Sequence, residues 1–169
     1  MGKTTAYLVV LAEREAILWV LQNELMAFPA RPRREVSALQ PGDELVLLTT
    51  RGAYHNPTRD RTRVIGTAIV HSKVAPFEPE VEIVGRTFAS GCQIRLETLA
   101  PYSAGPEIGP LAPQIQALHG EKNWGWLLRK PLVLLDESDV ALLKHELQSH
   151  LRELNESLLT YRNSIKAPT

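Results

Sequence analysis

The sequence predicts an α+β protein built on a small, curled, mostly antiparallel sheet. Short apolar runs with strand character recur along the first 100 residues. The gaps between most of these runs are too short for the crossover helices that parallel neighbours need. Helical spacing is found after the first run, in one inserted segment and at the C-terminal end. A chain of 169 residues with this pattern is expected to fold around one main core.

The chain is expected to begin with a strand and a helix. Residues 6–12, AYLVVLA, are rich in β-branched side chains and short enough for a buried strand. Residues 13–25 follow with apolar side chains at helical spacing. Pro29, Pro32, Pro41 and Gly42 then break regular structure, and the Pro-Gly-Asp turn leads into ELVLLTT, residues 44–50, as a second buried strand.

Three further strands are predicted in the middle of the chain, over residues 62–72, 81–85 and 92–99. The last of these places Ile94 and Leu96 on one face and Arg95 and Glu97 on the other. A Pro- and Gly-rich segment follows, then a short helix ending at Leu118. Residues 131–135, PLVLL, are expected to form a sixth strand.

The C-terminal segment from about residue 138 to 165 is predicted to be one long amphipathic helix, about 40 Å in length. Its first half is expected to pack on the barrel. Beyond about Ser149 the seven-residue spacing favours a partner chain, which would give a homodimer through residues 140–165. This divides the chain into a domain at 1–147 and a helical extension at 148–169. The seven-residue stripe consists of Val140, Leu147, Leu154 and Tyr161, with Leu151, Leu158 and Ile165 beside it.

Composition sets limits on partners and location. The chain has 19 basic and 19 acidic residues, so a nucleic-acid or membrane partner would have to be met by a local patch. Cys92 is the single cysteine, which excludes an intramolecular disulfide. No apolar run approaches the roughly 20 residues that span a bilayer. We therefore expect a cytoplasmic protein with no membrane association.

Catalytic motifs give no support for an enzyme. Gly2-Lys3-Thr4 lacks the preceding strand and glycine of a phosphate loop. The five histidines are scattered, and His145 and His150 fall on different helix faces, so no metal site is expected. A small enzyme that uses Cys92 or a histidine is kept as an alternative, although a lone cysteine entering a strand is usually a small buried hydrophobe.

Arginines and aromatic side chains indicate a binding function. Guanidinium groups supply phosphate contacts to nucleic acid, and aromatic rings stack on unpaired bases. The alternatives are a solvated charged surface for the arginines and core packing for the rings. The arginines form two clusters, Arg31, Arg33 and Arg34, and then Arg51, Arg59, Arg61 and Arg63; the rings are Phe28, Tyr54, Trp124 and Trp126.

Five sequence pieces in a fixed order resemble the EVE domain of the PUA-like superfamily, which is related to the YTH readers. They are Tyr7-Leu8-Val9-Val10, MAFPARPR, LQPGDELVLL, RVIGTAIV and EKNWGW, and the resemblance covers about residues 5–147. It implies a small mixed β-barrel with flanking helices. It also implies a non-enzymatic module that needs no cofactor and binds DNA or RNA, with recognition of a modified base.

The resemblance also implies a base pocket and a set of arginines that hold the nucleic-acid backbone. Met26 stands where the family usually has a Trp, and Leu48 where a Tyr is frequent, which predicts a wider and less aromatic pocket. Trp126 is expected to pack beneath the barrel or against the terminal helix. The predicted pocket residues are Ala12, Glu13, Met26, Ala27, Phe28, Pro29, Leu48, Thr49, Thr50 and Trp124; the backbone residues are the seven arginines of the two clusters.

Overall fold

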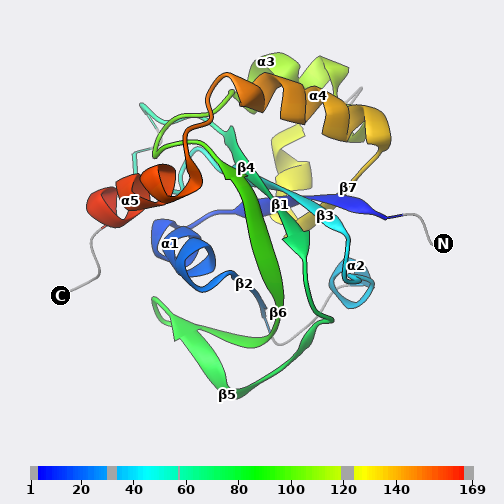
Figure 1. Ribbon diagram of the computed structural model, residues 1–169, viewed down its shortest axis with the longest axis vertical. Coiled ribbons are helices and arrows are strands. Elements are labelled where there is room, and N and C mark those ends of the chain that lie inside the picture. Colours follow the sequence, from blue (N-terminus) through cyan, green and yellow to red (C-terminus); the bar gives the residue numbers. More distant parts are fainter. Residues whose placement is uncertain (1–3, 30–33, 57, 119–123, 166–169) are drawn as a thin grey trace.

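The computed structural model describes residues 4–29, 34–56, 58–118 and 124–165 (Figure 1). Within these residues seven strands form one mixed sheet in the order β2-β6-β4-β3-β1-β7, with β5 paired to β6 beside this path. The sheet curls into a half-barrel flanked by helices. The predicted α+β class is therefore confirmed.

The centre of the sheet combines parallel and antiparallel pairs. β1 (Ala6–Leu11) and β3 (Glu44–Thr49) run parallel. Antiparallel partners flank them: β7 (Leu132–Leu135) lies beside β1, and β4 (Arg63–Val70) beside β3. A parallel pair requires a long connection, which is provided here by residues 12–43.

That connection contains a strand that the sequence did not predict. α1 (Arg14–Asn23) ends at Glu24, whose φ of 49° lies in the left-handed region and turns the chain. β2 (Leu25–Phe28) follows at once, so Leu25 starts a strand and does not end the helix as expected. The Glu24 carboxylate accepts a hydrogen bond from the Leu96 amide at 3.0 Å, which fixes this corner to the sheet. α2 (Arg34–Ser37) completes the connection.

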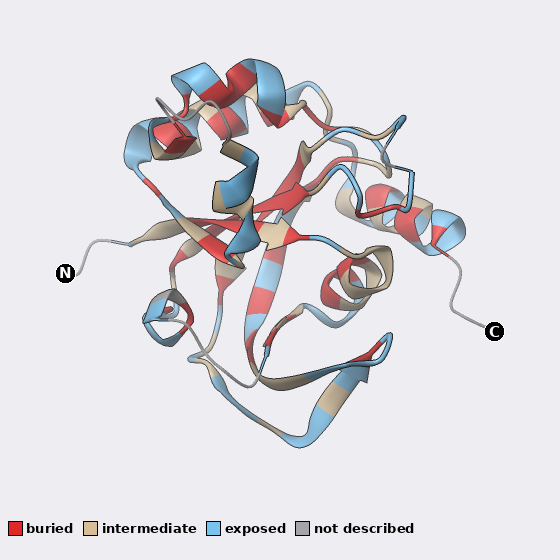
Figure 2. Ribbon diagram, turned by 180° about the vertical axis from the view of Figure 1, so that it is seen from behind, coloured by how far each residue is buried: buried red, intermediate tan, exposed pale blue. Residues whose placement is uncertain are grey.

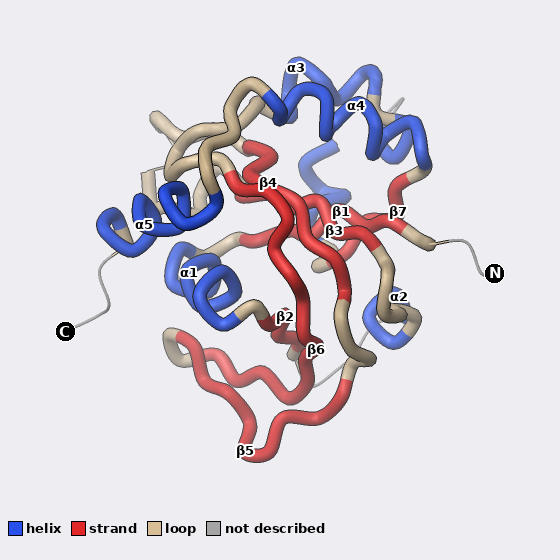
Figure 3. Tube along the Cα trace, in the orientation of Figure 1, coloured by secondary structure: helices blue, strands red, loops and turns tan. Residues whose placement is uncertain are grey.

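β6 (Arg86–Leu99) is the longest strand and joins both parts of the sheet. Its second half pairs with β4, and its first half pairs with β2 and with β5 (Ala75–Ile83). β5 begins six residues earlier than the predicted strand. Together β5 and the start of β6 form a two-stranded arm that extends away from the helices α3 and α4 (Figure 3). The Phe77 ring of this arm meets Trp19 of α1 edge to face, with ring centroids 6.3 Å apart.

Two apolar cores lie on opposite faces of the sheet. In β3, Leu45 and Leu47 belong to one core, and Val46 and Leu48 belong to the other. Alternate side chains of a strand point to opposite faces, so a strand covered on both sides is an uninterrupted apolar run, as ELVLL is. Figure 2 shows the buried positions running along these central strands.

Different helices cover the two cores. The first core lies under α1 and α5 (Leu154–Ser164). The second lies under α3 (Ile108–Leu111), the 3-10 turns at Ala112–Gln114 and Gln116–Leu118, and α4 (Glu137–Gln148). Buried Asp139 joins α4 to these turns, because its carboxylate accepts hydrogen bonds from the amides of Gln116 and Ala117 at 2.6 and 3.1 Å.

The single long C-terminal helix is a wrong prediction, because the structure has two helices there. α4 ends at Gln148, and Arg152 then pairs with Leu99 in an isolated β-bridge. The Glu153 side chain caps α5 by accepting hydrogen bonds from the amides of Asn155 and Glu156 at 3.1 and 2.9 Å.

The seven-residue stripe is largely occupied by contacts within the chain. Leu147 belongs to the second core, whereas Tyr161 and Ile165 belong to the first. The Tyr161 hydroxyl donates a hydrogen bond to the Ala100 carbonyl at 3.0 Å. The homodimer through residues 140–165 stays a prediction, but these side chains are not available to carry it.

Among the described residues, no helix has both the length and the apolar character needed to cross a membrane.

Candidate functional site

A cavity of about 320 Å³ opens between the end of β1, the start of α1 and the strand β2. We call it the β2 pocket. Six of the ten predicted pocket residues line it, and they come from two short segments. Those at the end of β1 are Ala12 and Glu13; those of β2 and the residue after it are Met26, Ala27, Phe28 and Pro29.

The inner wall of the β2 pocket is apolar. Met26 and Phe28 are almost fully buried, and Val20 of α1 and Val36 of α2 lie beside them. β2 is held in place by β6, where Ala27 pairs with Gly91. A side chain at Gly91 would collide with the Met26 carbonyl and the Phe77 ring, so glycine permits this close packing.

The rim of the β2 pocket carries three cations that sequence reasoning did not assign to it. Arg86 comes from the arm, with its guanidinium 5.7 Å from the centroid of the Phe88 ring. Arg129 and Lys130 come directly before Pro131 and β7. All three are exposed, and no carboxylate pairs with them among the described residues. Glu13 is the acidic group on the same rim.

Arg86 and Phe88 could not be found from local sequence, because they reach the pocket only through the pairing of β6 with β2. Residues 128–131 are brought there by the pairing of β7 with β1. A signal for Arg129 and Lys130 did exist, since two adjacent cations directly precede a predicted strand.

A second cavity, of about 480 Å³, holds two of the remaining predicted pocket residues, Thr50 and Trp124. We call it the Trp124 pocket. It lies between the end of β3, the loop at residues 51–62 and the 3-10 helix Trp124–Arg129. Leu128 lines both cavities, so the predicted single site is two neighbouring pockets with a shared wall.

Leu48 and Thr49, also predicted for the pocket, line neither cavity. Leu48 is buried in the second core. Thr49 is buried too, and its hydroxyl donates a long hydrogen bond to the Arg63 carbonyl at 3.5 Å. Leu48 is therefore a core side chain at the position where the resemblance to EVE domains would favour an aromatic residue.

The two tryptophans of the WGW segment have different environments. Trp124 is half-buried against the second core, while Trp126 is 51% exposed. A 3-10 helix has three residues per turn, so positions 124 and 126 point in different directions. The prediction that Trp126 packs beneath the barrel or against the terminal helix is wrong.

The predicted backbone arginines also divide. Arg51 and Arg61 line the Trp124 pocket, and Arg59 is exposed in the same loop. Arg34 is exposed at the start of α2. Arg31 and Arg33 lie outside the described residues.

Arg63 stays a predicted backbone residue, but unlike Arg51 its guanidinium has partners within the fold. It donates a hydrogen bond to the Gly105 carbonyl at 2.8 Å and forms an ion pair with Glu107 at 3.5 Å. A half-buried guanidinium with these partners is less accessible to a phosphate than the exposed Arg51 and Arg61 are.

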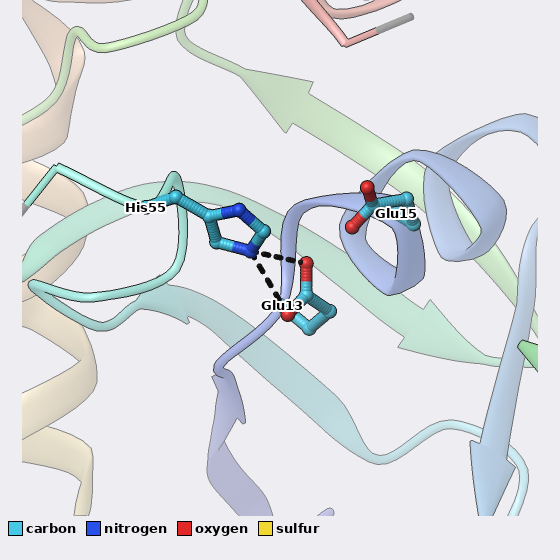
Figure 4. Close-up of side chains that lie close together, drawn as sticks. All are labelled: Glu13, Glu15 and His55. Carbon is cyan, nitrogen blue, oxygen red and sulfur yellow. Dashed lines mark hydrogen bonds and ion pairs between the residues drawn. The ribbon is translucent and has the colours of Figure 1, made fainter. Parts of the chain in front are cut away.

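The loop at residues 51–62 is fastened to the start of α1. His55 Nε2 lies 2.9 and 3.1 Å from the two carboxylate oxygens of Glu13 (Figure 4), and the Arg14 amide donates to the Ala53 carbonyl at 2.9 Å. These contacts fix the Trp124 pocket relative to the β2 pocket.

Donor atoms of Glu13, Glu15 and His55 lie within 4.8 Å of one another, close enough to hold a metal ion. The hydrogen bond between His55 and Glu13 already explains why two of these three side chains lie close together. The prediction made no use of this group, because His55 is 42 residues from Glu13 in the chain.

Cys92 is poorly suited to nucleophilic catalysis. It is buried in β6 opposite Met26, and burial raises the pKa of its thiol to about 11. The thiolate is the reactive form, so this side chain is a weak nucleophile at neutral pH. The burial weighs against the alternative of an enzyme that uses Cys92.

Comparison with known proteins gives a likeness in structure alone. The chain matches no protein-family model and no curated protein. Human THYN1 in complex with DNA containing 5-methylcytosine has a TM-score of 0.52 and 11% identity, covering 89% of this chain and 99% of that one.

Two further solved structures have similar scores. The Mmi1 YTH domain in complex with RNA has a TM-score of 0.57 and 11% identity, covering 88% of this chain and 83% of that one. A hypothetical protein from Leishmania major has a TM-score of 0.57 and 11% identity, covering 87% and 96%. At these identities the likeness concerns the fold alone, and this chain shares its fold with the THYN1 and YTH-domain structures.

Proposed function

We propose that this protein is an EVE-like module that binds nucleic acid and takes one base, a modified one, into the β2 pocket. The observation that carries the proposal is an apolar pocket whose rim presents three exposed cations without carboxylate partners in the described residues. An apolar interior suits a base, and cations outside it suit the phosphates that flank a base. The complexes of THYN1 with DNA and of the Mmi1 YTH domain with RNA support this choice of ligand class.

The pocket size fits one base better than a larger ligand. Its volume of about 320 Å³ lies near the lower end of small-molecule pockets, which range over about 300–1,000 Å³. A base can enter the pocket only when it is unstacked, so the ligand is a single strand or a nucleotide flipped out of a duplex.

Recognition would combine apolar contact with a few polar contacts. Met26 and Phe28 replace the water around the base, and the flexible Met26 side chain adapts to an added methyl group. The Glu13 carboxylate on the rim is an acceptor for an amino group of the base edge. Arg86, Arg129 and Lys130 hold the flanking phosphates. We infer that the module acts in the cytoplasm, catalyses no reaction and needs no cofactor.

The test is a binding titration with labelled single-stranded and duplex oligonucleotides, as DNA and as RNA, with and without a methylated cytosine or adenine. Affinity should fall as salt rises, because each phosphate contact releases counterions. It should be higher for a methylated strand. Absence of binding to every strand would contradict the proposal, whereas equal affinity for methylated and unmethylated strands would remove the modified base from it.

A further inference from the structure

We propose that the Trp124 pocket is a second nucleotide subsite, which takes the base and phosphate next to the base held in the β2 pocket. This inference rests on the proposed function. Sequence reasoning placed Trp124 in the same pocket as Met26, but the structure puts them in separate cavities. Trp124 is therefore available to a different nucleotide.

The Trp124 pocket has a ring and open space beside it. A Cβ atom at Gly109 would lie 3.9 Å from Cζ2 of Trp124, so the indole packs against the backbone of α3. Around Gly52 and Gly125 no heavy atom lies within 4 Å of the position a Cβ would take. A positioned indole with free volume nearby is the arrangement that base stacking needs.

The charges in this pocket favour a phosphate. Arg51 is exposed and has no hydrogen bond or ion pair within the described part of the chain. Arg61 is positioned by one nitrogen, Nη1, which donates to the carbonyls of Asp60 and Thr58 at 3.0 and 3.4 Å. Its other nitrogens have no bond to the described residues. Glu107 also lines the cavity, but Arg63 forms an ion pair with it.

The two pockets are placed to receive neighbouring nucleotides of one strand. Leu128 forms part of the wall of both, so only one side chain's thickness separates them there. Arg129 and Lys130 follow directly in the chain on the rim of the β2 pocket. Cations thus border both cavities, and a single strand whose bases are unstacked can place consecutive bases on either side of Leu128.

The experiment uses labelled hexamers, made as DNA and as RNA, in which every nucleotide is abasic except one methylated base or that base and one neighbour. In the wild-type protein the neighbouring base should raise the affinity roughly 5- to 150-fold, which is the range for stacking on one ring. In Trp124→Ala this gain should disappear, and in Trp124→Phe much of it should return. Trp126→Ala, two residues away and exposed, is the matched control and should keep the gain.

The arginines are tested separately through the salt dependence of binding. Arg51→Gln and Arg61→Gln should each reduce the slope of log affinity against log salt by about 0.7 for a single strand. Arg162→Gln, exposed in α5 and lining neither cavity, should leave the slope unchanged. Gly52→Leu adds a side chain where there is room for one, and should remove the second-base gain without removing any core contact.

The outcomes separate this inference from the proposed function. If one base gives no gain over a fully abasic hexamer, the β2 pocket is not a base site, and both proposals fall. If one base gives a gain but the second base adds nothing, the second subsite alone is overturned. The same holds if the second base raises the affinity of Trp124→Ala and Gly52→Leu as much as it raises that of the wild type. A second-base gain that both variants lose supports it.

Discussion

Ala16 is the smallest side chain that α1 contributes to the β2 pocket, and it tests that pocket without disturbing the core. Ala16→Met fills part of the cavity with a side chain that a helix tolerates well. We expect at least a tenfold loss of affinity for a methylated strand and a small change in stability. Fluorescence anisotropy and a urea titration measure the two effects.

The control for Ala16→Met is Ala141→Met, which adds the same atoms to an exposed position of α4 outside the β2 pocket. It should bind as the wild type does. Unchanged binding by Ala16→Met would show that the base is held elsewhere.

Cys92 gives a prediction for pH. The pKa of its thiol is about 11 in the folded protein, because burial disfavours the thiolate. At pH 8 the native thiol should react with a disulfide reagent far more slowly than the thiol of urea-unfolded protein. Fast labelling of the native protein would show that β6 opens readily. An absorbance assay follows the reaction.

The same shift links Cys92 to stability. The unfolded thiol ionises at its ordinary pKa, which is lower than about 11, so the unfolded state loses this proton first. The contribution of the protonated Cys92 thiol to the free energy of unfolding is therefore complete below the ordinary thiol pKa, and it is lost as pH rises toward 11. Urea titrations between pH 8 and 10 should therefore show a smaller fall in the free energy of unfolding for Cys92→Ser than for the wild type.

Residues of the pocket were predictable where they are neighbours in the chain. Met26 to Pro29 were identified together because they form one short segment with a family resemblance. Arg86 was missed, because it lies about 60 residues away and is brought in by strand pairing. Trp124 was predicted to line the same pocket as Met26 and Phe28, but a sequence does not show whether two aromatic positions share one cavity.

At the level of elements, the start of α5 depends on a single side chain. Glu153 accepts hydrogen bonds from the amides of Asn155 and Glu156, two of the donors that a helix leaves unpaired at its first turn. Glu153→Ala should lower the free energy of unfolding by about 1 kcal/mol. Asn163→Ala, exposed near the other end of α5, serves as the control in the same urea titration and should change it less. Equal values for the two variants would show that the cap contributes nothing.

The division of the C-terminal helix could not be predicted from its spacing. Residues 138–165 contain no Gly or Pro, and apolar side chains recur every seven positions through the break. The break is fixed by tertiary contacts, namely the bridge between Leu99 and Arg152 and the cap at Glu153. By contrast, β1, β3 and β4 were found within two residues, because each is a short apolar run bounded by turn residues.

Across the whole molecule, α5 is expected to be required for folding of the half-barrel. Tyr161 is fully buried and contacts the first core, which also contains Met26 and Phe28 of the β2 pocket. A chain that ends at residue 148 would leave this core open to water. It should lose the near-ultraviolet circular dichroism signal of the full chain and melt without a sharp transition.

The predicted division at residue 148 leads to the opposite expectation, because an independent domain over residues 1–147 would stay folded after truncation. Tyr161→Ala provides a milder test in the full chain and should cost about 3–5 kcal/mol, as other large aromatic deletions do. Tyr161→Phe keeps the ring, removes the hydroxyl that donates to the Ala100 carbonyl, and should cost about 1 kcal/mol. A truncated chain with native spectra would support the two-part division.

The arm formed by β5 and the start of β6 forms one side of the β2 pocket. Ile83, Arg86 and Phe88 belong to this arm, whereas Met26 and Phe28 belong to the body of the molecule. Among the described residues β5 pairs with β6 alone, and its pairing shifts register between Pro76 and Val81, so the arm is a two-stranded ribbon with an interruption. The edge-to-face contact between the Trp19 and Phe77 rings joins this arm to α1. The width of the β2 pocket therefore depends on where a two-stranded ribbon lies, and under the proposed function we expect the position of this ribbon to set which bases the pocket accepts.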